Sequence, residues 1–162
     1  MNLVLVAPTV AIVLHIIEEF VFPGGFLSWH RNYRPQHTRS ISPKFAIIIN
    51  ALLLLFSGQV VFLGPTPEGV AVWLVVAAIL FSNALFHIRG AVATKSYSPG
   101  LITSIILYLP LAVAGYYYFL HAGLASIGTA VVALIMGGSY PLVSVLLHKW
   151  RSKNNEEQEP HT

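Results

Sequence analysis

The sequence predicts an all-α integral membrane protein: a bundle of five transmembrane helices with the N-terminus outside and the C-terminus in the cytoplasm. Three observations predict this fold class. Apolar residues make up 56% of the 162 residues and charged residues only 9%, whereas soluble domains carry about 25% charged residues. The apolar residues fall into runs close to the roughly 20 that a membrane-spanning helix needs. The basic residues all lie between these runs or in the tail.

The five apolar runs define the predicted spans, which together form a single transmembrane helical domain over residues 1–151. The first run carries Glu18 and Glu19 and has no basic segment before it. We therefore interpret it as a helix and not as a cleaved signal peptide. From 152 to 162 the composition turns polar, and this tail is predicted to be disordered. The predicted spans are 3–22, 45–63, 70–88, 101–120 and 124–147.

The orientation follows from the basic residues. With five spans, every Lys and Arg falls on one side of the membrane, while the N-terminus and the turns 64–69 and 121–123 carry none. Because positive charge is retained on the cytoplasmic side, this side is predicted to be cytoplasmic. The expected location is the cell's inner (plasma) membrane, as a multi-pass protein. The nine basic residues are Arg31, Arg34, Arg39, Lys44, Arg89, Lys95, Lys149, Arg151 and Lys153.

Composition also excludes several kinds of site. The chain has no Cys, which excludes disulfides, iron–sulfur clusters and thiolate-bound zinc. The formal net charge of +3 comes from residues whose positions fit the membrane topology, so no nucleic-acid partner is predicted. Membrane lipid is an expected partner, and a homo-oligomer remains compatible with the sequence.

Polar side chains gather near the cytoplasmic ends of the predicted spans. His15, Glu18 and Glu19 are spaced i, i+3 and i+4, so they share one face of the first helix. Asn83 and His87 are four residues apart in the third helix, which runs in the same direction. An ionised Glu inside the membrane costs about 2.5–3.5 kcal/mol. We therefore expect these groups to face the protein interior as one cluster; the alternative is a set of unrelated residues near the membrane surface.

Further polar residues are predicted at the same depth. Asn50 comes early in the second helix, and Tyr97 precedes the fourth, where Ser98 is expected to cap the helix. His30 and His37 lie in the first cytoplasmic loop. They are placed to cover the cluster and are not favoured as ligands.

The order of these motifs resembles that of a known family. His15-Ile16-Ile17-Glu18-Glu19, the later His87 and Tyr97-Ser98-Pro99-Gly100 are similar to the motifs of the His-x-x-Glu-Glu (HXXEE) family of small bacterial membrane proteins. That family combines such a motif with a further histidine and a Tyr-x-Pro-Gly motif. The resemblance covers residues 15–100, more than half of the chain. The family has no established function, so the resemblance implies a site and no particular chemistry.

Two imidazoles and two carboxylates could bind one divalent metal, and this donor set suits Zn²⁺, Fe²⁺ or Mn²⁺. A full di-iron site is not expected, because it needs four carboxylates. Asn83 and Asn50 are expected to hydrogen bond to the ligands and orient them. The candidate ligands are His15, Glu18, Glu19 and His87.

The sequence favours a metal-dependent enzyme that acts on a hydrophobic or amphiphilic, lipid-like small molecule from the inner leaflet. Its candidate catalytic groups are Glu18, Glu19 and Tyr97. Three alternatives stay open: a metal-free acid/base enzyme of isomerase type, a proton-coupled transporter, and a structural or binding membrane protein. No other cofactor is predicted.

Overall fold

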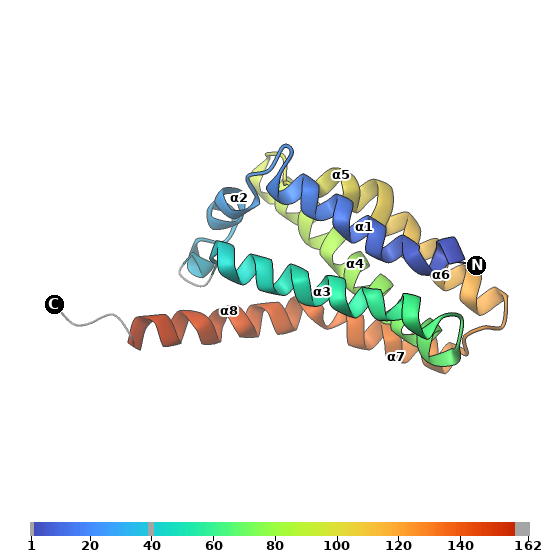
Figure 1. Cartoon of the computed structure of the whole chain (residues 1–162). Coiled ribbons are helices and arrows are strands. Elements are labelled where there is room, and N and C mark those ends of the chain that lie inside the picture. Colours follow the sequence, from blue (N-terminus) through green and yellow to red (C-terminus); the bar gives the residue numbers. More distant parts are fainter. Residues whose placement is uncertain (1, 39–40, 158–162) are drawn as a thin grey trace.

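The computed structural model describes residues 2–38 and 41–157. Within these residues the chain consists of helices joined by short turns, with no strand. Figure 1 shows the long helices side by side in an elongated bundle, with the short helix α2 at one end. The elements in order are α1 (Asn2–Phe20), α2 (Phe26–Tyr33), the 3₁₀ turn η1 (Pro35–His37), α3 (Pro43–Leu63), α4 (Pro67–Thr94), α5 (Leu101–Thr103), the π-helical segment η2 (Ser104–Tyr108), α6 (Leu109–His121), α7 (Ile127–Gly138) and α8 (Tyr140–Glu157).

Five helical segments of the described chain are long and apolar enough to cross a membrane. This confirms the predicted all-α architecture with five such helices, and each segment overlaps one predicted span. The largest differences are at the third and fifth segments, which are longer than predicted at one or both ends. The segments are Leu3–Phe20, Pro43–Leu63, Pro67–Thr94, Leu101–His121 and Ile127–Arg151.

Capping residues explain where α3 and α4 begin. Ser42 Oγ accepts a hydrogen bond from the N–H of Phe45 at 3.2 Å, and Thr66 Oγ1 accepts one from the N–H of Gly69 at 3.1 Å. Each cap is followed by a proline, which suits the first helical position because its missing N–H would have no partner there. Both helices therefore begin before the first run of apolar residues.

Helix α4 lies at the centre of the bundle (Figure 1). In the most apolar part of α4, 56% of the residues are buried inside the protein, whereas the share is 39% or less in each of the other four membrane-length segments. Trp73 of α4 is fully buried, and its Nε1 donates to the carbonyl oxygen of Val4 at 2.8 Å. Gly115 of α6 makes room for this indole, since a Cβ there would lie 1.8 Å from the ring. A Cβ on Gly137 of α7 would lie 2.4 Å from the carbonyl oxygen of Val75 in α4, so glycines allow both α6 and α7 to pack closely against α4.

Prolines interrupt the last two spans. Pro110 has no N–H to donate to the preceding turn, and the chain just before it widens into the π-helical segment η2. Pro141 likewise cannot donate to the carbonyl of Gly137, and the helix breaks at Ser139 between α7 and α8. The π-helical segment η2 ends at Tyr108, and it therefore sets the direction in which this fully buried side chain points.

The end of the bundle that carries α2, η1, the start of α3 and the end of α8 contains the basic residues that the structure describes, and we call it the basic end (Figure 1). Helix α2 packs onto α4 there: a Cβ on Gly90 would lie 2.5 Å from the Trp29 ring. Helix α8 continues to Glu157, although the polar composition predicts disorder from 152 onward. Extending an existing helix costs far less than nucleating one. Residues 158–162 of the predicted tail lie outside the described residues.

Candidate metal centre

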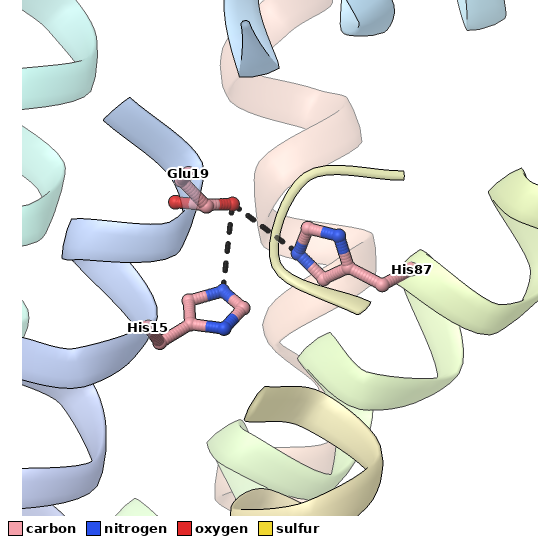
Figure 2. Close-up of side chains that lie close together, drawn as sticks. All are labelled: His15, Glu19 and His87. Carbon is pink, nitrogen blue, oxygen red and sulfur yellow. Dashed lines mark ion pairs between the residues drawn. The ribbon is translucent and has the colours of Figure 1, made fainter. Parts of the chain in front are cut away.

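Three side chains converge inside the bundle near the basic end (Figure 2). His15 and Glu19 lie one turn apart on α1, and His87 lies on α4. Glu19 Oε1 is 3.4 Å from His15 Nε2 and 3.2 Å from His87 Nε2. The potential ligand atoms all lie within 4.8 Å of one another. The exposed fractions of His15, Glu19 and His87 are 2%, 5% and 0%, so this His15–Glu19–His87 group is enclosed by protein.

Hydrogen bonds on the far side of each imidazole orient its ring. His15 Nδ1 lies 2.8 Å from Thr103 Oγ1, and the Thr103 hydroxyl donates to Glu18 Oε2 at 2.5 Å. Because that hydroxyl proton is used by the carboxylate, Thr103 accepts the Nδ1–H of His15. His15 Nε2 then carries a lone pair and no proton, which is the form that accepts a hydrogen bond from Asn83 Nδ2 and that can bind a metal. His87 Nδ1 lies 2.9 Å from Ser98 Oγ, which directs its Nε2 toward Glu19.

Glu18 points away from the His15–Glu19–His87 group. Its carboxylate accepts four hydrogen bonds: from the N–H of Ile102 at 2.9 Å, from the N–H of Thr103 at 2.7 Å, and from the hydroxyls of Thr103 and Tyr97. The two N–H groups belong to the first turn of α5, where no residue of the same helix can accept them. A carboxylate at this end also interacts favourably with the helix dipole. Glu18 thus holds the start of the fourth span against α1.

Tyr97 and Ser98, in the turn before α5, also hydrogen bond to residues of the site. Tyr97 is 40% exposed and donates to Glu18, rather than reaching over the His15–Glu19–His87 group. Burial and this hydrogen bond raise the pKa of Tyr97, which keeps the phenol protonated as a donor. The prediction that Ser98 caps the helix is wrong, since the N-cap is Gly100 and the Ser98 hydroxyl contacts His87 instead.

Gly100 brings the backbone into contact with both imidazoles. Its φ is 98°, a conformation that residues with a side chain rarely adopt. A Cβ at this position would lie 2.6 Å from His15 Cε1 and 2.8 Å from His87 Cε1. The absence of a side chain at Gly100 is therefore what allows the two rings to approach the turn.

The two asparagines lie in different surroundings. Asn83 Nδ2 is 3.1 Å from His15 Nε2, so Asn83 directly contacts the His15–Glu19–His87 group. Asn50 Nδ2 donates to the carbonyl oxygen of Ala46 in its own helix at 3.0 Å. The side chain of Asn50 lines a cavity next to the group and forms no hydrogen bond with it among the described residues.

That cavity has a volume of about 290 Å³ and extends from the His15–Glu19–His87 group between α3, α4 and α8. Its walls are mostly apolar, with Leu53 and Phe56 of α3 and Leu147 of α8 among them. At the basic end it is bordered by residues of α2 and by Arg34, which follows that helix. The polar side chains around the cavity are His15, Glu19, His30, Arg34, Asn50, Ser82, Asn83, Tyr108, Tyr140 and Ser144.

Helix α2 covers the His15–Glu19–His87 group from the basic end. The Trp29 ring is stacked on His87, with centroids 6.0 Å apart and planes 18° apart, and the Phe26 ring lies 5.9 Å from the same imidazole. His30 lines the cavity and its ring lies 6.3 Å from that of His37. Neither of these two histidines is within the set of convergent ligand atoms found among the described residues.

Two residues of the site, Tyr108 and Thr103, were not predicted from the sequence. Tyr108 is fully buried, its ring centroid lies 4.5 Å from that of His15, and its hydroxyl has no hydrogen-bond partner among the described residues. Its direction depends on the π-helical segment η2, for which Pro110 is the only local signal. Thr103 becomes recognisable only when α5 is known to lie beside Glu18.

Five helices that are long and apolar enough to cross a membrane surround a buried His/Glu group that could hold a metal ion, and this combination suggests a multi-pass helical membrane protein. The family described as "Protein of unknown function with HXXEE motif" matches residues 6–115, and the chain belongs to this family. The uncharacterized protein YrkK of Bacillus subtilis (strain 168) is 29% identical over 147 residues, which cover 82% of this chain and 88% of that protein. No solved structure matches the chain. The matched family region contains the whole His15–Glu19–His87 group.

Proposed function

We propose that the protein is a divalent-metal-dependent enzyme of the bacterial inner membrane that acts on a hydrophobic or lipid-like substrate. The observation that carries this proposal is the buried His15–Glu19–His87 group, whose ligand atoms lie within 4.8 Å of one another. Two imidazoles and one carboxylate form a donor set found in catalytic zinc sites and also suit Fe²⁺ or Mn²⁺. Three protein ligands leave a coordination position for water or substrate.

Electrostatics support a cation at this point. The hydrogen bond to Thr103 leaves a lone pair on His15 Nε2, and this atom and His87 Nε2 both face the Glu19 carboxylate. A buried carboxylate is costly unless it is paired with a positive charge or hydrogen bonded. A divalent cation between the three groups would offset the negative charge and use the lone pairs as ligands.

Asn83 offers a fourth ligand. Its amide nitrogen now lies 3.1 Å from His15 Nε2, where a bound metal would displace it. A half-turn of the amide would present the carbonyl oxygen to the same point, and oxygen ligands are suitable for Fe²⁺ and Mn²⁺.

The cavity supports an apolar substrate. Small-molecule sites are mostly lined by hydrophobic side chains with a few polar groups that fix orientation, and the walls beside the His15–Glu19–His87 group have this composition. The free Tyr108 hydroxyl provides a donor inside the cavity. Glu18 and Tyr97 contact each other and the start of α5, so we assign them to holding the site in place rather than to the reaction.

The topology belongs to the same proposal: the basic end faces the cytoplasm and the N-terminus lies outside. A fluorescent protein fused after Thr162 should fluoresce, because it would fold in the cytoplasm. Alkaline phosphatase inserted in the turn at 64–69 should be active, because this turn would lie outside. Inactive phosphatase at 64–69 together with a dark C-terminal fusion would reverse the orientation and place the His15–Glu19–His87 group in the outer leaflet.

Metal content of the purified protein tests the proposed function. We expect about one equivalent of Zn, Fe or Mn in the parent protein in detergent, measured by elemental analysis. His87→Ala should retain less than about a tenth of this metal, since even the loss of a hydrogen-bond partner of a ligand costs about 10–100-fold in affinity. His121→Ala, an exposed histidine at the opposite end, is the matched control and should retain it all. A folded parent that contains and accepts no metal would contradict the proposal.

Metal-free acid/base catalysis by the same group is the second candidate. The observation that favours it is the position of Glu19 Oε1, which lies 3.4 Å and 3.2 Å from the two imidazole nitrogens. Over such distances a carboxylate and an imidazole can pass a proton directly to one another, so Glu19 could take a proton from a substrate in the adjoining cavity and an imidazole could return one to it. This candidate would replace the first if the parent protein remains metal-free after incubation with each of the three metals.

A further inference from the structure

Arg34 borders the cavity at the basic end. It is half-buried, and its guanidinium lies 5.0 Å from the centre of the Phe86 ring and 5.4 Å from that of Tyr33. Among the described residues it has no carboxylate partner. A guanidinium that stacks on aromatic rings still has its N–H donors free, because they point outward in the plane of the group. This planar arrangement matches the oxygens of a carboxylate or a phosphate.

A further cation lies beside a residue of the same cavity. Arg151 of α8 lies 4.5 Å over the ring of Phe45, which lines the cavity. Positive charge thus reaches this end of the cavity from two parts of the chain: Arg34, which follows α2, and Arg151 on α8. The electrostatic field of these two cations attracts anions.

Beyond this end the cavity is suited to a hydrocarbon chain. Its walls are built by apolar side chains of α3 and α8, and its volume of about 290 Å³ is just below the range of about 300–1,000 Å³ for small-molecule sites. A second, largely apolar groove lies between α1 and α3, and Ala46 and Asn50 line both it and the cavity. A cavity of this size and lining is suited to one hydrocarbon chain rather than two.

The charged end of the cavity also lies next to the candidate metal centre. Arg34 covers the Phe86 ring, and that ring lies 5.2 Å from the ring of His87. A single aromatic side chain thus separates the guanidinium from an imidazole of the His15–Glu19–His87 group. Atoms adjoining a headgroup at Arg34 would therefore be the ones presented to this group and to the Tyr108 hydroxyl.

We propose that the cavity binds a single-chain amphiphile with an anionic headgroup, a carboxylate or a phosphate, which Arg34 recognises while the chain lies between α3 and α8. This inference rests on the proposed function and names the substrate class of that site. It also assigns the reacting bond to the headgroup end of the ligand rather than to the middle of its chain.

Ligands with one chain and different headgroups test the inference on the parent protein in a maltoside detergent. Dodecanoate and dodecyl phosphate should raise the thermal unfolding midpoint and bind at least tenfold more tightly than dodecanol or dodecyltrimethylammonium. Inorganic phosphate alone should not bind at the same concentration, which separates a lipid headgroup from a free anion. Binding of one anionic amphiphile and not the other would identify the headgroup. Equal binding of the neutral or cationic amphiphile would overturn the inference.

Variants of two arginines assign the recognition. Arg34→Gln should remove the preference for anionic amphiphiles, a loss of at least tenfold in affinity. Arg31→Gln is the matched control, because Arg31 lies exposed on α2 and does not line the cavity. An unchanged preference in Arg34→Gln would overturn the role of this residue. If Arg34→Gln does not fold, Ser144→Phe on α8 fills the cavity and should abolish binding of the anionic amphiphiles; unchanged binding there would equally overturn the inference.

The same measurements separate this inference from the proposed function. Binding is measured on protein treated with a chelator and on protein reloaded with metal. Arg34-dependent binding in a protein that never takes up metal would support the ligand class and contradict the metal-dependent enzyme. Retained metal without any preference for anionic headgroups would support the metal centre and contradict the ligand class.

Discussion

Gly100→Ala is expected to abolish metal retention and to destabilise the protein by about 2–5 kcal/mol. Part of this cost is the left-handed conformation, which costs a residue with a side chain about 1–2 kcal/mol. The rest is overpacking, about 1–3 kcal/mol, because the new Cβ would lie 2.6 Å from His15 and 2.8 Å from His87. Both imidazoles must move apart to admit it. Thermal unfolding in detergent and elemental analysis measure the two effects.

Gly58→Ala is the matched control for this substitution. Gly58 lies in α3, and a Cβ there would meet no atom within 4 Å. Alanine is also the better helix former by about 1 kcal/mol, so the control should keep its metal and lose no stability. Full metal retention in Gly100→Ala would show that the two rings do not depend on the close approach of this turn.

Glu18→Gln and Glu19→Gln are expected to fail in different ways, although the two residues are adjacent. Glu18→Gln should destabilise the protein by about 3 kcal/mol or more, because each hydrogen bond to a charged group contributes about 1.5–3 kcal/mol and Glu18 accepts four. It should still bind metal when metal is in excess. Glu19→Gln should lose the metal, because it removes the anionic ligand between the imidazoles.

Thermal unfolding and metal titration of both variants check this expectation, with Glu68→Gln as the control. Glu68 is exposed at the start of α4, away from the His15–Glu19–His87 group, and its variant should match the parent in both measurements. Equal loss of metal affinity in the Glu18 and Glu19 variants would mean that Glu18 is itself a ligand, as the spacing of the sequence motif predicts.

The five helices were predictable because the chain has too few charged residues to cover the surface of a soluble protein, and its apolar residues fall into five long runs. Their packing was not predictable from the same property. Helices α3 and α4 have nearly the same mean hydropathy, yet 17% of one and 56% of the other is buried. Inside a membrane an apolar residue is equally suited to lipid and to protein, so apolarity gives no information about which helix is central. The glycines that receive Trp73 and the α4 backbone carry that information instead, through shape.

The candidate site was predictable only to the level of helical spacing and depth. Those two properties bring His15, Glu19 and His87 to one level on two helices that run in the same direction. They do not separate Glu18 from Glu19, since that depends on where the first turn of α5 lies. The position of Tyr108 could not be predicted for a related reason. The direction of its side chain is set by the π-helical segment before Pro110, and the regular period of an α-helix does not describe such a segment.

The wall of the cavity and the hydrogen bonds that support the His15–Glu19–His87 group come from different parts of the chain. Among the described residues, the partners named above that hydrogen bond to the side chains of His15, His87 and Glu18 all lie from Asn83 to Thr103, within the region 6–115 that the family shares. Helix α8 lies outside that region and contributes cavity lining such as Val143, Ser144 and Leu147. Substitutions in α8 can therefore change the shape of the cavity while those hydrogen bonds stay unchanged. Under the proposed function, such substitutions would alter which molecule the protein accepts and would leave the His15–Glu19–His87 group intact.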